Sequence, residues 1–463
     1  MAATPAATSL AVLEMARTGG FAQIREMFAP QLRPMVTAEA IQAAWSAELG
    51  RRGPVASIGA PVSEPAQGGV VVVKIPVTCA HGALTVVVSV TEAGQLTGIQ
   101  LAPASAAEPI APWEPPGYAD PDMFDEQDVT VGSGSLAVPG TLSLPRRSGP
   151  RTAVVLLAGS GPMDRDETIG RNKPFKDLAW GLASTGVAVL RFDKVTYAHP
   201  SEISQAGDVT VVQEYMRHAS AAIHLLQAHP DIDPSRVFVL GHSLGGTVAP
   251  RVAAEEQSVA GMVILAGGTQ PLHWAAVRQV RYLAALDPDT AAASQPIIEA
   301  MSNQARLVDD PDLSASTPAS DLPFGVPASY WLDLRGYKPV EVAAALGRPM
   351  LILQGGRDYQ ATIADDLAGW KSGLAQHRGV TIHVYDPDNH FFFPGAGPSA
   401  PAEYEPAQHM DPAVVADIAS WLTTVVDKSD VSAKARVRLS SALCAVRWRI
   451  RVCSGVCALW NCT

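Results

Sequence analysis

The stretch "VFVLGHSLGGTVAP", residues 237–250, combines a short strand, a sharp turn and the start of a helix. Four apolar residues lead into Gly-His-Ser-Leu-Gly-Gly, and the small residues that follow favour a helix. A serine between two glycines, here Ser243, is either a nucleophile on a strained turn or part of an ordinary strand-to-helix connection. The rest of the sequence has to decide between these two interpretations.

Length and composition indicate a globular protein with a sizeable core. The chain has 463 residues, of which 47% are hydrophobic and 17% are charged, so two or three domains are expected. The net charge of −11 argues against a nucleic acid or an anionic membrane as partner, because both require a basic surface. We find no basic segment ahead of an apolar run at the N-terminus and no stretch long enough to span a membrane, which predicts a cytoplasmic protein.

The cysteines are unevenly distributed. Cys79 stands alone, and the other four of the five cysteines fall in the last twenty residues, so the body of the chain is not a disulfide scaffold. Residues 428–463 are basic, and their cysteine spacing lacks the paired Cys-x2-Cys of zinc sites. We therefore predict a poorly ordered tail with no role in the chemistry, and no metal.

The first part of the chain predicts a small α+β domain over residues 1–105, followed by a linker. Thr37 is placed to cap a helix whose apolar residues recur every fourth position, with Gly50 as its end. Two β-branched runs joined by residues 80–82 predict a hairpin. Residues 106–122 are rich in proline and alanine and are interpreted as a linker.

Residues 123–427 have the pattern of an α/β domain. Apolar strands alternate with helical segments, and strands that are apolar along their whole length are typical of a parallel sheet covered on both faces. Residues 268–345 interrupt this alternation with a helical segment that carries several aromatic residues; we predict a lid, the alternative being an ordinary helical elaboration. The predicted strands are residues 152–157, 187–192, 237–240, 262–266, 349–354 and 380–385.

The ends of these strands supply partners for Ser243. A serine hydroxyl is a weak nucleophile that needs a base, and His390 lies just after the last strand. Asp358 follows the preceding strand and is placed to orient that histidine. The chain order serine, aspartate, histidine is the order found with such turns in α/β-hydrolases, and all three positions lie at one edge of the sheet. The sequence therefore predicts a catalytic triad.

Other residues compete for these roles. His242 lies inside the turn, where a packing role is favoured, and His383 lies within a strand, where a structural role is favoured. Asp388 is close to His390 along the same loop, but residues so near in sequence rarely reach the imidazole, so it is a distant second choice for the acid.

Acyl transfer also needs donors for a tetrahedral oxyanion. The amide of Leu244, directly after the nucleophile, is one candidate, and the amide of Ser160, in the loop after the strand 152–157, is the other. The alternative is that Gly159 and Gly161 only turn the chain. The charged residues 164–166 are interpreted as bracing this loop.

Four segments together resemble a known family. They are residues 158–194, 237–246, 351–360 ("LILQGGRDYQ") and 388–395 ("DNHFFFPG"). The sequence resembles the bacterial α/β-hydrolase esterases of the EstD type, which are grouped near the serine aminopeptidase-like hydrolases, and the resemblance covers residues 15–427. The N-terminal segment resembles the small DUF3887 domain that precedes the hydrolase in many of these proteins.

This resemblance implies a carboxylesterase with an α/β-hydrolase fold that prefers short acyl esters. It assigns Ser243 as nucleophile, Asp358 as acid and His390 as base, acting through an acyl-enzyme. It implies a small-molecule ester as partner, no metal or organic cofactor, and allows a homo-oligomer. The sequence departs from the family at Ala158, where a histidine is common, and at residues 193–196, where Asp-Lys-Val-Thr replaces Asp-Lys-Arg-Gly.

Two alternatives to the esterase remain open. A peptidase, thioesterase or acyltransferase would use the same triad, because the pocket and not the triad selects the leaving group. A non-catalytic binding protein with this fold is the other alternative, and the intact set of Ser243, Asp358 and His390 argues against it.

Overall fold

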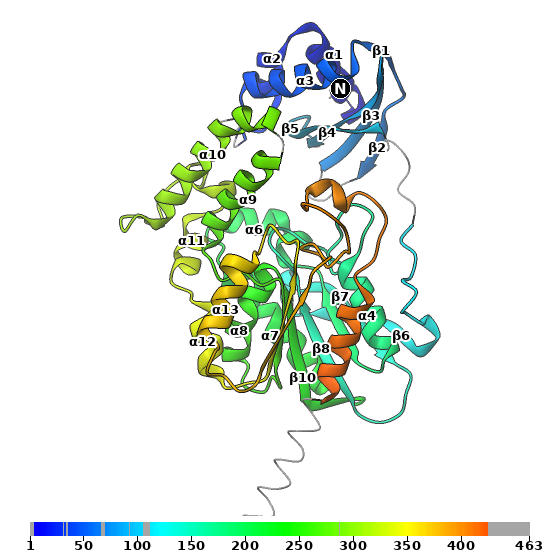
Figure 1. Ribbon diagram of the computed structural model, residues 1–463, viewed down its shortest axis with the longest axis vertical. Coiled ribbons are helices and arrows are strands. Elements are labelled where there is room, and N and C mark those ends of the chain that lie inside the picture. Colours follow the sequence, from blue (N-terminus) through cyan, green and yellow to red (C-terminus); the bar gives the residue numbers. More distant parts are fainter. Residues whose placement is uncertain are drawn as a thin grey trace, which may run out of the picture.

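The structure is a computed structural model that describes residues 4–30, 32–33, 36–65, 70–91, 93–104, 112–286 and 288–424. Its strands form two separate sheets, one in the N-terminal region and a larger one in the remainder, which lie at opposite ends of the molecule (Figure 1). The predicted tail, residues 428–463, and residues 106–111 of the predicted linker lie outside the described residues.

The N-terminal region is an antiparallel sheet with helices packed against it. The strand order is β1-β3-β4-β5, with β2 paired to β3, and the predicted hairpin is the β3–β4 pair. Apolar side chains of the helices and of β3 and β4 form one core cluster. The elements are α1 (Pro5–Thr18), α2 (Phe21–Met27), α3 (Ala38–Arg52), β1 (Val55–Ile58), β2 (Val62–Pro65), β3 (Val70–Cys79), β4 (Gly82–Thr91) and β5 (Leu96–Pro103).

The start of α3 is confirmed and its predicted end is wrong. The hydroxyl of Thr37 accepts a hydrogen bond from the amide of Ala40 at 3.1 Å, as expected of a helix cap. The helix continues through Gly50 to Arg52 and ends at Gly53, whose φ is 74°. A glycine inside a helix costs only about 1 kcal/mol relative to alanine, so Gly50 alone does not stop it, whereas the positive φ at Gly53 does.

The larger sheet has the order β13-β12-β11-β10-β8-β9-β7-β6. β7 is antiparallel to both β6 and β9, and the other neighbouring strands are parallel. This mostly parallel sheet confirms the predicted α/β class. The strands are β6 (Phe124–Val131), β7 (Val138–Pro145), β8 (Arg151–Leu157), β9 (Ala188–Phe192), β10 (Ile232–His242), β11 (Met262–Leu265), β12 (Met350–Gly355) and β13 (Val380–Tyr385).

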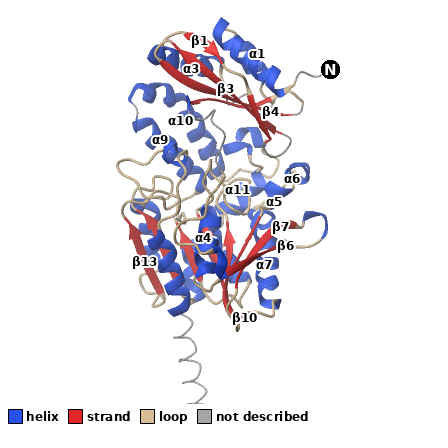
Figure 2. Ribbon diagram, turned by 90° about the vertical axis from the view of Figure 1, so that its right-hand side faces the viewer, coloured by secondary structure: helices blue, strands red, loops and turns tan. Residues whose placement is uncertain are grey.

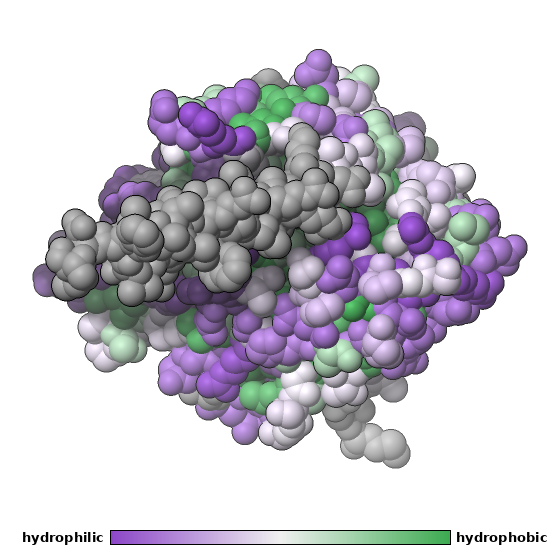
Figure 3. Space-filling view, turned by 90° about the horizontal axis from the view of Figure 1, so that it is seen from below, coloured by the Kyte–Doolittle hydropathy of each residue, from purple (hydrophilic) through white to green (hydrophobic). Residues whose placement is uncertain are grey.

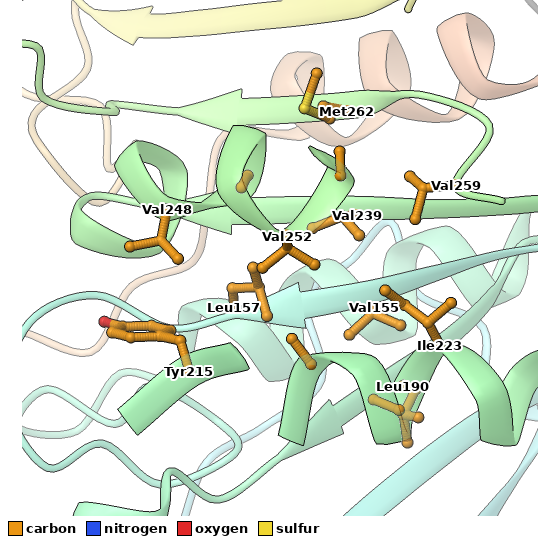
Figure 4. Packing of buried hydrophobic residues seen from close by; sticks show 14 of the residues in the cluster. Val155, Leu157, Leu190, Tyr215, Ile223, Val239, Val248, Val252, Val259 and Met262 are labelled. Carbon is orange, nitrogen blue, oxygen red and sulfur yellow. The ribbon is translucent and has the colours of Figure 1, made fainter. Parts of the chain in front are cut away.

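Each face of this sheet buries its own core. Consecutive strand residues point to opposite faces, so Val155 and Val239 belong to one apolar cluster while Val154 and Leu240 belong to the other. Helices α7 (Arg217–Ala228) and α8 (Leu244–Glu255) cover the first face, part of whose core is shown in Figure 4. Helix α4 (Pro174–Ser184) and the helix of residues 412–424 cover the second, so helices flank the sheet on both sides (Figure 2).

The chain between β11 and β12 is helical, as the sequence predicts. It has a small core of its own around the buried Trp331. In both ribbon views α9 and α10 lie between the larger sheet and the N-terminal region (Figures 1 and 2). The helices are α9 (Leu272–Leu286), α10 (Pro288–Asp309), α11 (Ala328–Arg335) and α12 (Pro339–Leu346).

The face of the molecule seen in Figure 3 is mixed in polarity. On the face seen from below, hydrophilic side chains cover most of what is visible, with only small hydrophobic patches between them (Figure 3). In the part of the chain that the structure describes, no helix combines the length and the apolar character needed to cross a membrane.

Candidate active site

The turn between β10 and α8 carries Ser243 in a strained backbone conformation. Its φ of 53° and ψ of −120° are unusual for a residue with a side chain. A Cβ on Gly241 would lie 2.1 Å from the carbonyl oxygen of Gly245, and a Cβ on Gly245 would lie 2.1 Å from that of Leu157. Only glycine fits at either position, and the tight turn presents Ser243 at the carboxyl edge of the sheet.

The structure brings Asp358 and His390 together at the same edge. Asp358 follows β12 and His390 follows β13, so two neighbouring parallel strands deliver the two side chains. The Nδ1 atom of His390 donates to Oδ2 of Asp358 at 2.8 Å, and both residues are buried. This hydrogen bond leaves Nε2 as the nitrogen that can take a proton from a nucleophile.

The carboxylate of Asp358 is held in one orientation by further donors. Its Oδ1 accepts from the amides of Gln360 and Ala361 at 2.7 and 3.0 Å, and its Oδ2 accepts from Nε2 of Gln354 at 3.0 Å. Such hydrogen bonds stabilise a carboxylate and fix its geometry. Gln354 was not predicted to be a site residue. The one feature of the sequence that could have indicated it is a polar side chain near the end of an otherwise apolar strand.

Ser243 lies where two cavities meet. His390 and Ser243 line a cavity of about 450 Å³. Ser243, Leu244 and Ser160 line a second cavity of about 810 Å³, to which the helical insertion contributes Trp331. Both volumes are in the range of small-molecule sites, about 300–1,000 Å³. A substrate therefore has room on either side of the serine.

Two of the competing residues lie apart from this arrangement. Asp388 is fully buried, and no side-chain hydrogen bond reaches its carboxylate oxygens from the described residues. Burial and the nearby charge of Asp411 raise the pKa of Asp388 to about 7. His383 is half-exposed in β13 and pairs with Asp417 at 2.9 Å. Of the two aspartates, it is Asp358 whose carboxylate meets the imidazole of His390.

His242, for which a packing role is favoured from the sequence, is buried, and its ring also takes part in a polar network. Its Nδ1 lies 2.9 Å from Oε1 of Glu167, and its Nε2 lies 2.9 Å from the carbonyl oxygen of His390. The two imidazole rings are 4.7 Å apart. Burial favours the neutral form of His242, but the carboxylate of Glu167 outweighs it and raises the pKa. His242 thus ties Glu167 to the backbone of His390.

The loop after β8 passes directly over the nucleophile. A Cβ on Gly159 would lie 3.2 Å from the Cβ of Ser243. The amide of Gly159 donates to Oε1 of Glu167 at 2.6 Å, so it is not free to bind an oxyanion. The next amide along the chain, that of Ser160, belongs to a residue exposed on the larger cavity. Glu167 was not predicted to be a site residue, because in the sequence it is only one of several acidic residues in this loop.

The charges of this loop brace it, as predicted. The guanidinium of Arg165 donates to both carboxylate oxygens of Asp193, at 3.0 and 3.1 Å. Asp166 pairs with Lys173 at 2.8 Å and with Arg191 at 2.9 Å. Each of these pairs ties the loop to a neighbouring element.

Comparison with known proteins adds the family. Residues 150–390 match the hydrolase family described as serine aminopeptidase, S33. The chain belongs to this family. It is also 36% identical to Esterase EstD of Thermotoga maritima over 343 residues, which cover 74% of this chain and 77% of that protein.

Two solved structures are among those to which the chain is similar. Est1E from Butyrivibrio proteoclasticus is 15% identical, with a TM-score of 0.42 over 65% of this chain and 99% of that one. An esterase from Pyrococcus furiosus is 15% identical, with a TM-score of 0.40 over 68% of this chain and 99% of that one.

The family match confirms two predictions made from the sequence. These are the α/β-hydrolase fold and the likeness to EstD-type esterases. As for metals, the residues that the structure describes include no group of three or more His, Cys, Asp or Glu side chains placed to hold an ion.

Proposed function

We propose that the protein is a serine carboxylesterase whose triad is Ser243, His390 and Asp358. The observation that carries this proposal is the convergence of the three residues: a serine on a strained turn lines the same cavity as a histidine that is hydrogen-bonded to a buried aspartate at 2.8 Å. The 36% identity to Esterase EstD supports ester hydrolysis as the reaction.

The reaction begins with attack of Ser243 on the ester carbonyl. As its oxygen bonds to the carbonyl carbon, its proton passes to Nε2 of His390, and Asp358 stabilises the resulting imidazolium. The tetrahedral intermediate then expels the alkoxide, which takes the proton from His390 and leaves as the alcohol. Water repeats these steps on the acyl-enzyme, giving the carboxylic acid and free Ser243.

The negative oxygen of each intermediate needs donors. We assign the amides of Leu244 and Ser160 to this role. Leu244 is the first residue of α8, where unpaired amides and the helix dipole favour negative charge. The amide of Gly159 already donates to Glu167, so we assign the role to the next amide along the chain, that of Ser160. Losing one such donor typically lowers kcat about 10²–10³-fold.

The substrate class follows from the resemblance to EstD-type esterases. We propose short acyl esters as preferred substrates, with the two cavities beside Ser243 taking the acyl and alcohol parts. An activity profile with p-nitrophenyl esters from acetate to decanoate, measured on wild type and Ser243→Ala, tests both points. We expect a maximum at short chains and loss of activity in the variant; equal activity of the two proteins would reject the proposal.

A second candidate is a peptidase with the same triad, which the family description as a serine aminopeptidase favours. The two candidates differ in leaving group, so matched ester and anilide substrates with the same acyl group distinguish them. Faster turnover of the anilide would favour the peptidase. If a fluorophosphonate left Ser243 unlabelled, a non-catalytic binding protein would become the better explanation.

We further propose the division of the chain into a DUF3887-like domain (1–105), a linker (106–122) and a catalytic domain (123–427) with a lid at 268–345. The separate antiparallel sheet and core of the N-terminal region support the first boundary. The insertion's contribution of Trp331 to the larger cavity supports the lid. Limited proteolysis tests the division: we expect the first cleavage within 106–122, and cleavage inside either sheet region would contradict it.

A further inference from the structure

The peptide that joins Gly159 to Ser160 is held by two buried donors. Its carbonyl oxygen, that of Gly159, accepts from Nζ of Lys194 at 2.8 Å and from the hydroxyl of Tyr215 at 2.8 Å; the same hydroxyl also lies 3.0 Å from the carbonyl oxygen of Ala158. A carbonyl oxygen has two lone pairs, so this one is fully used. The preceding peptide, which joins Ala158 to Gly159, is fixed as well, because the amide of Gly159 donates to Glu167.

The orientation of this carbonyl sets the direction of the Ser160 amide. The carbonyl of Gly159 and the N–H of Ser160 belong to one planar peptide unit, in which they point in opposite directions. Because the oxygen faces Lys194 and Tyr215 in the interior, the N–H faces away from them. Ser160 itself lines the cavity that also contains Ser243.

Lys194 is a buried cation with all its donors in use. Its side chain is 3% exposed, and besides the carbonyl of Gly159 it contacts Oε1 of Glu214 at 2.7 Å and the hydroxyl of Tyr215 at 2.8 Å. Burial lowers the pKa of Lys194, and the carboxylate of Glu214 opposes that shift. A buried charge is costly unless it is paired and hydrogen-bonded, and these three contacts match the three N–H groups of an ammonium.

The partners of Lys194 are themselves anchored. The ring of Tyr215 packs in the apolar core that also contains Val248 and Leu157, with its hydroxyl oxygen pointing away from Leu157 (Figure 4). The second oxygen of Glu214 accepts from the hydroxyl of Tyr330, on α11 of the insertion, at 2.5 Å. Core and insertion thus hold the ammonium in a fixed position.

We propose that Lys194 is a positioning residue of the oxyanion hole, which orients and polarises the Gly159–Ser160 peptide. An ammonium on the carbonyl oxygen draws electron density away from the amide nitrogen, and hydrogen bonds in such a chain strengthen one another. The N–H of Ser160 is then a stronger and better oriented donor to the negative oxygen above Ser243. This inference rests on the proposed esterase function and adds to it a residue that does not touch the substrate.

The test replaces the ammonium and keeps the length of the side chain. We expect Lys194→Met to lower kcat by about 10- to 100-fold, less than the 10²–10³-fold lost with a whole donor, with little change in KM. A trifluoromethyl ketone, which forms an oxyanion on Ser243, should lose affinity by the same factor as kcat/KM, while an amide with the same acyl group should not. Lys176→Met is the matched control. Lys176 lies on α4, with its ammonium over the ring of Trp113, and the variant should behave as wild type.

The outcomes separate this inference from the proposed function. If wild type hydrolyses esters, Ser243→Ala does not, and Lys194→Met equals wild type, the inference is wrong and the esterase stands. A loss of kcat without loss of trifluoromethyl ketone affinity would also overturn it. If Lys194→Met does not fold, Tyr215→Phe gives the answer: it removes one donor to the same carbonyl, so we expect a parallel but smaller loss of kcat and ketone affinity, and no loss contradicts the inference.

Discussion

The two sheets of this protein differ in what they bury besides apolar side chains. In the described part of the N-terminal region, the buried polar side chains are the neutral hydroxyls of Thr8, Ser9 and Thr85. In the hydrolase region the buried polar side chains include many charged or titratable ones: Arg151, Glu167, Asp177, Arg191, Asp193, Lys194, Glu214, His218, His242, His273, Asp358, Asp366, Asp388 and His390.

This difference supports our proposal that the hydrolase region carries the chemistry. A hydroxyl is easily satisfied inside a fold: that of Ser9 donates to the carbonyl of Pro5 at 2.9 Å. A buried charge costs several kcal/mol unless partners are arranged around it, and breaking such a pair is strongly destabilising. Perturbed titratable groups cluster at functional sites. Here the pKa of His242, next to Ser243 in the chain, is raised by Glu167 against the effect of burial, and burial lowers the pKa of Lys194, which donates to the carbonyl of Gly159. The N-terminal sheet has no comparable cluster among its described residues.

The largest expected effect contrasts one serine from each region. Ser243→Ala should lower kcat/KM for a p-nitrophenyl ester by about 10⁴–10⁶-fold, because nothing else supplies the nucleophile. Ser9→Ala removes a buried hydroxyl of the N-terminal region and should leave kcat/KM within about twofold, since it alters only local stability. Steady-state assays on both variants check this, and a large loss of activity in Ser9→Ala would break the contrast.

The next effect concerns the acid of the triad. Asp358→Asn keeps the shape of the side chain but removes the charge that orients and stabilises the imidazolium of His390, so kcat should fall by about 10⁴-fold. Asp388→Asn is the matched control, a buried aspartate in the loop of His390 whose carboxylate is not hydrogen-bonded to the imidazole. If the two variants lost activity equally, the assignment of Asp358 as the acid would fail.

A third comparison truncates one buried isoleucine in the core of each region. Ile24 and Ile264 are both fully buried, and truncation to alanine should lower the free energy of unfolding by about 2–5 kcal/mol in each case. Ile264 packs against Gly246, just after the Ser243 turn: its Cγ2 would lie 3.3 Å from a Cβ at that glycine. Ile264→Ala should therefore also lower kcat/KM. Ile24→Ala should leave kcat/KM of the folded protein unchanged. Urea unfolding and ester assays on both variants test this, and a loss of kcat/KM in Ile24→Ala comparable to that in Ile264→Ala would show that the regions are coupled.

The smallest effect is a pH dependence of stability at Asp388. Burial and Asp411 raise its pKa from 3.8 to about 7, so the folded protein holds a proton that the unfolded chain releases. The contribution of Asp388 to the free energy of unfolding is therefore fully present below pH 3.8 and is lost as the pH rises through about 7. Asp388→Asn, which imitates the protonated form, should be more stable than wild type by about 1–4 kcal/mol at pH 8 and similar to it at pH 4. Denaturant titrations at both values check this, and an equal difference at the two would contradict the shifted pKa.

The sequence was a good guide where one signal was local. The strand, turn and helix around Ser243 predicted the strained serine because glycines are required on both sides, and the order of Asp358 and His390 along the chain predicted which strand ends carry them. The Thr37 cap of α3 could also be predicted from the sequence, because capping depends on residues three positions apart.

It was a poor guide where a role depends on distant partners. Glu167 and Lys194 look like ordinary loop charges. Only the parallel pairing of β8 with β9 brings Lys194, 35 residues further along the chain, to the carbonyl of Gly159. His242 looked like a packing residue because its two acceptors, Glu167 and the carbonyl of His390, lie 75 and 148 residues away. The end of α3 was missed because Gly50 and Gly53 differ in backbone angle and not in residue type.

The central claim is that the buried charges around the carboxyl edge of the larger sheet activate Ser243 as a nucleophile. Mass spectrometry of the full chain after reaction with a fluorophosphonate, followed by peptide mapping, tests it most directly. We predict one adduct per chain, on Ser243, that forms in wild type, is absent in Ser243→Ala and forms much more slowly in Asp358→Asn. No adduct on the active wild-type protein, or an adduct on another residue at the same rate, would contradict it.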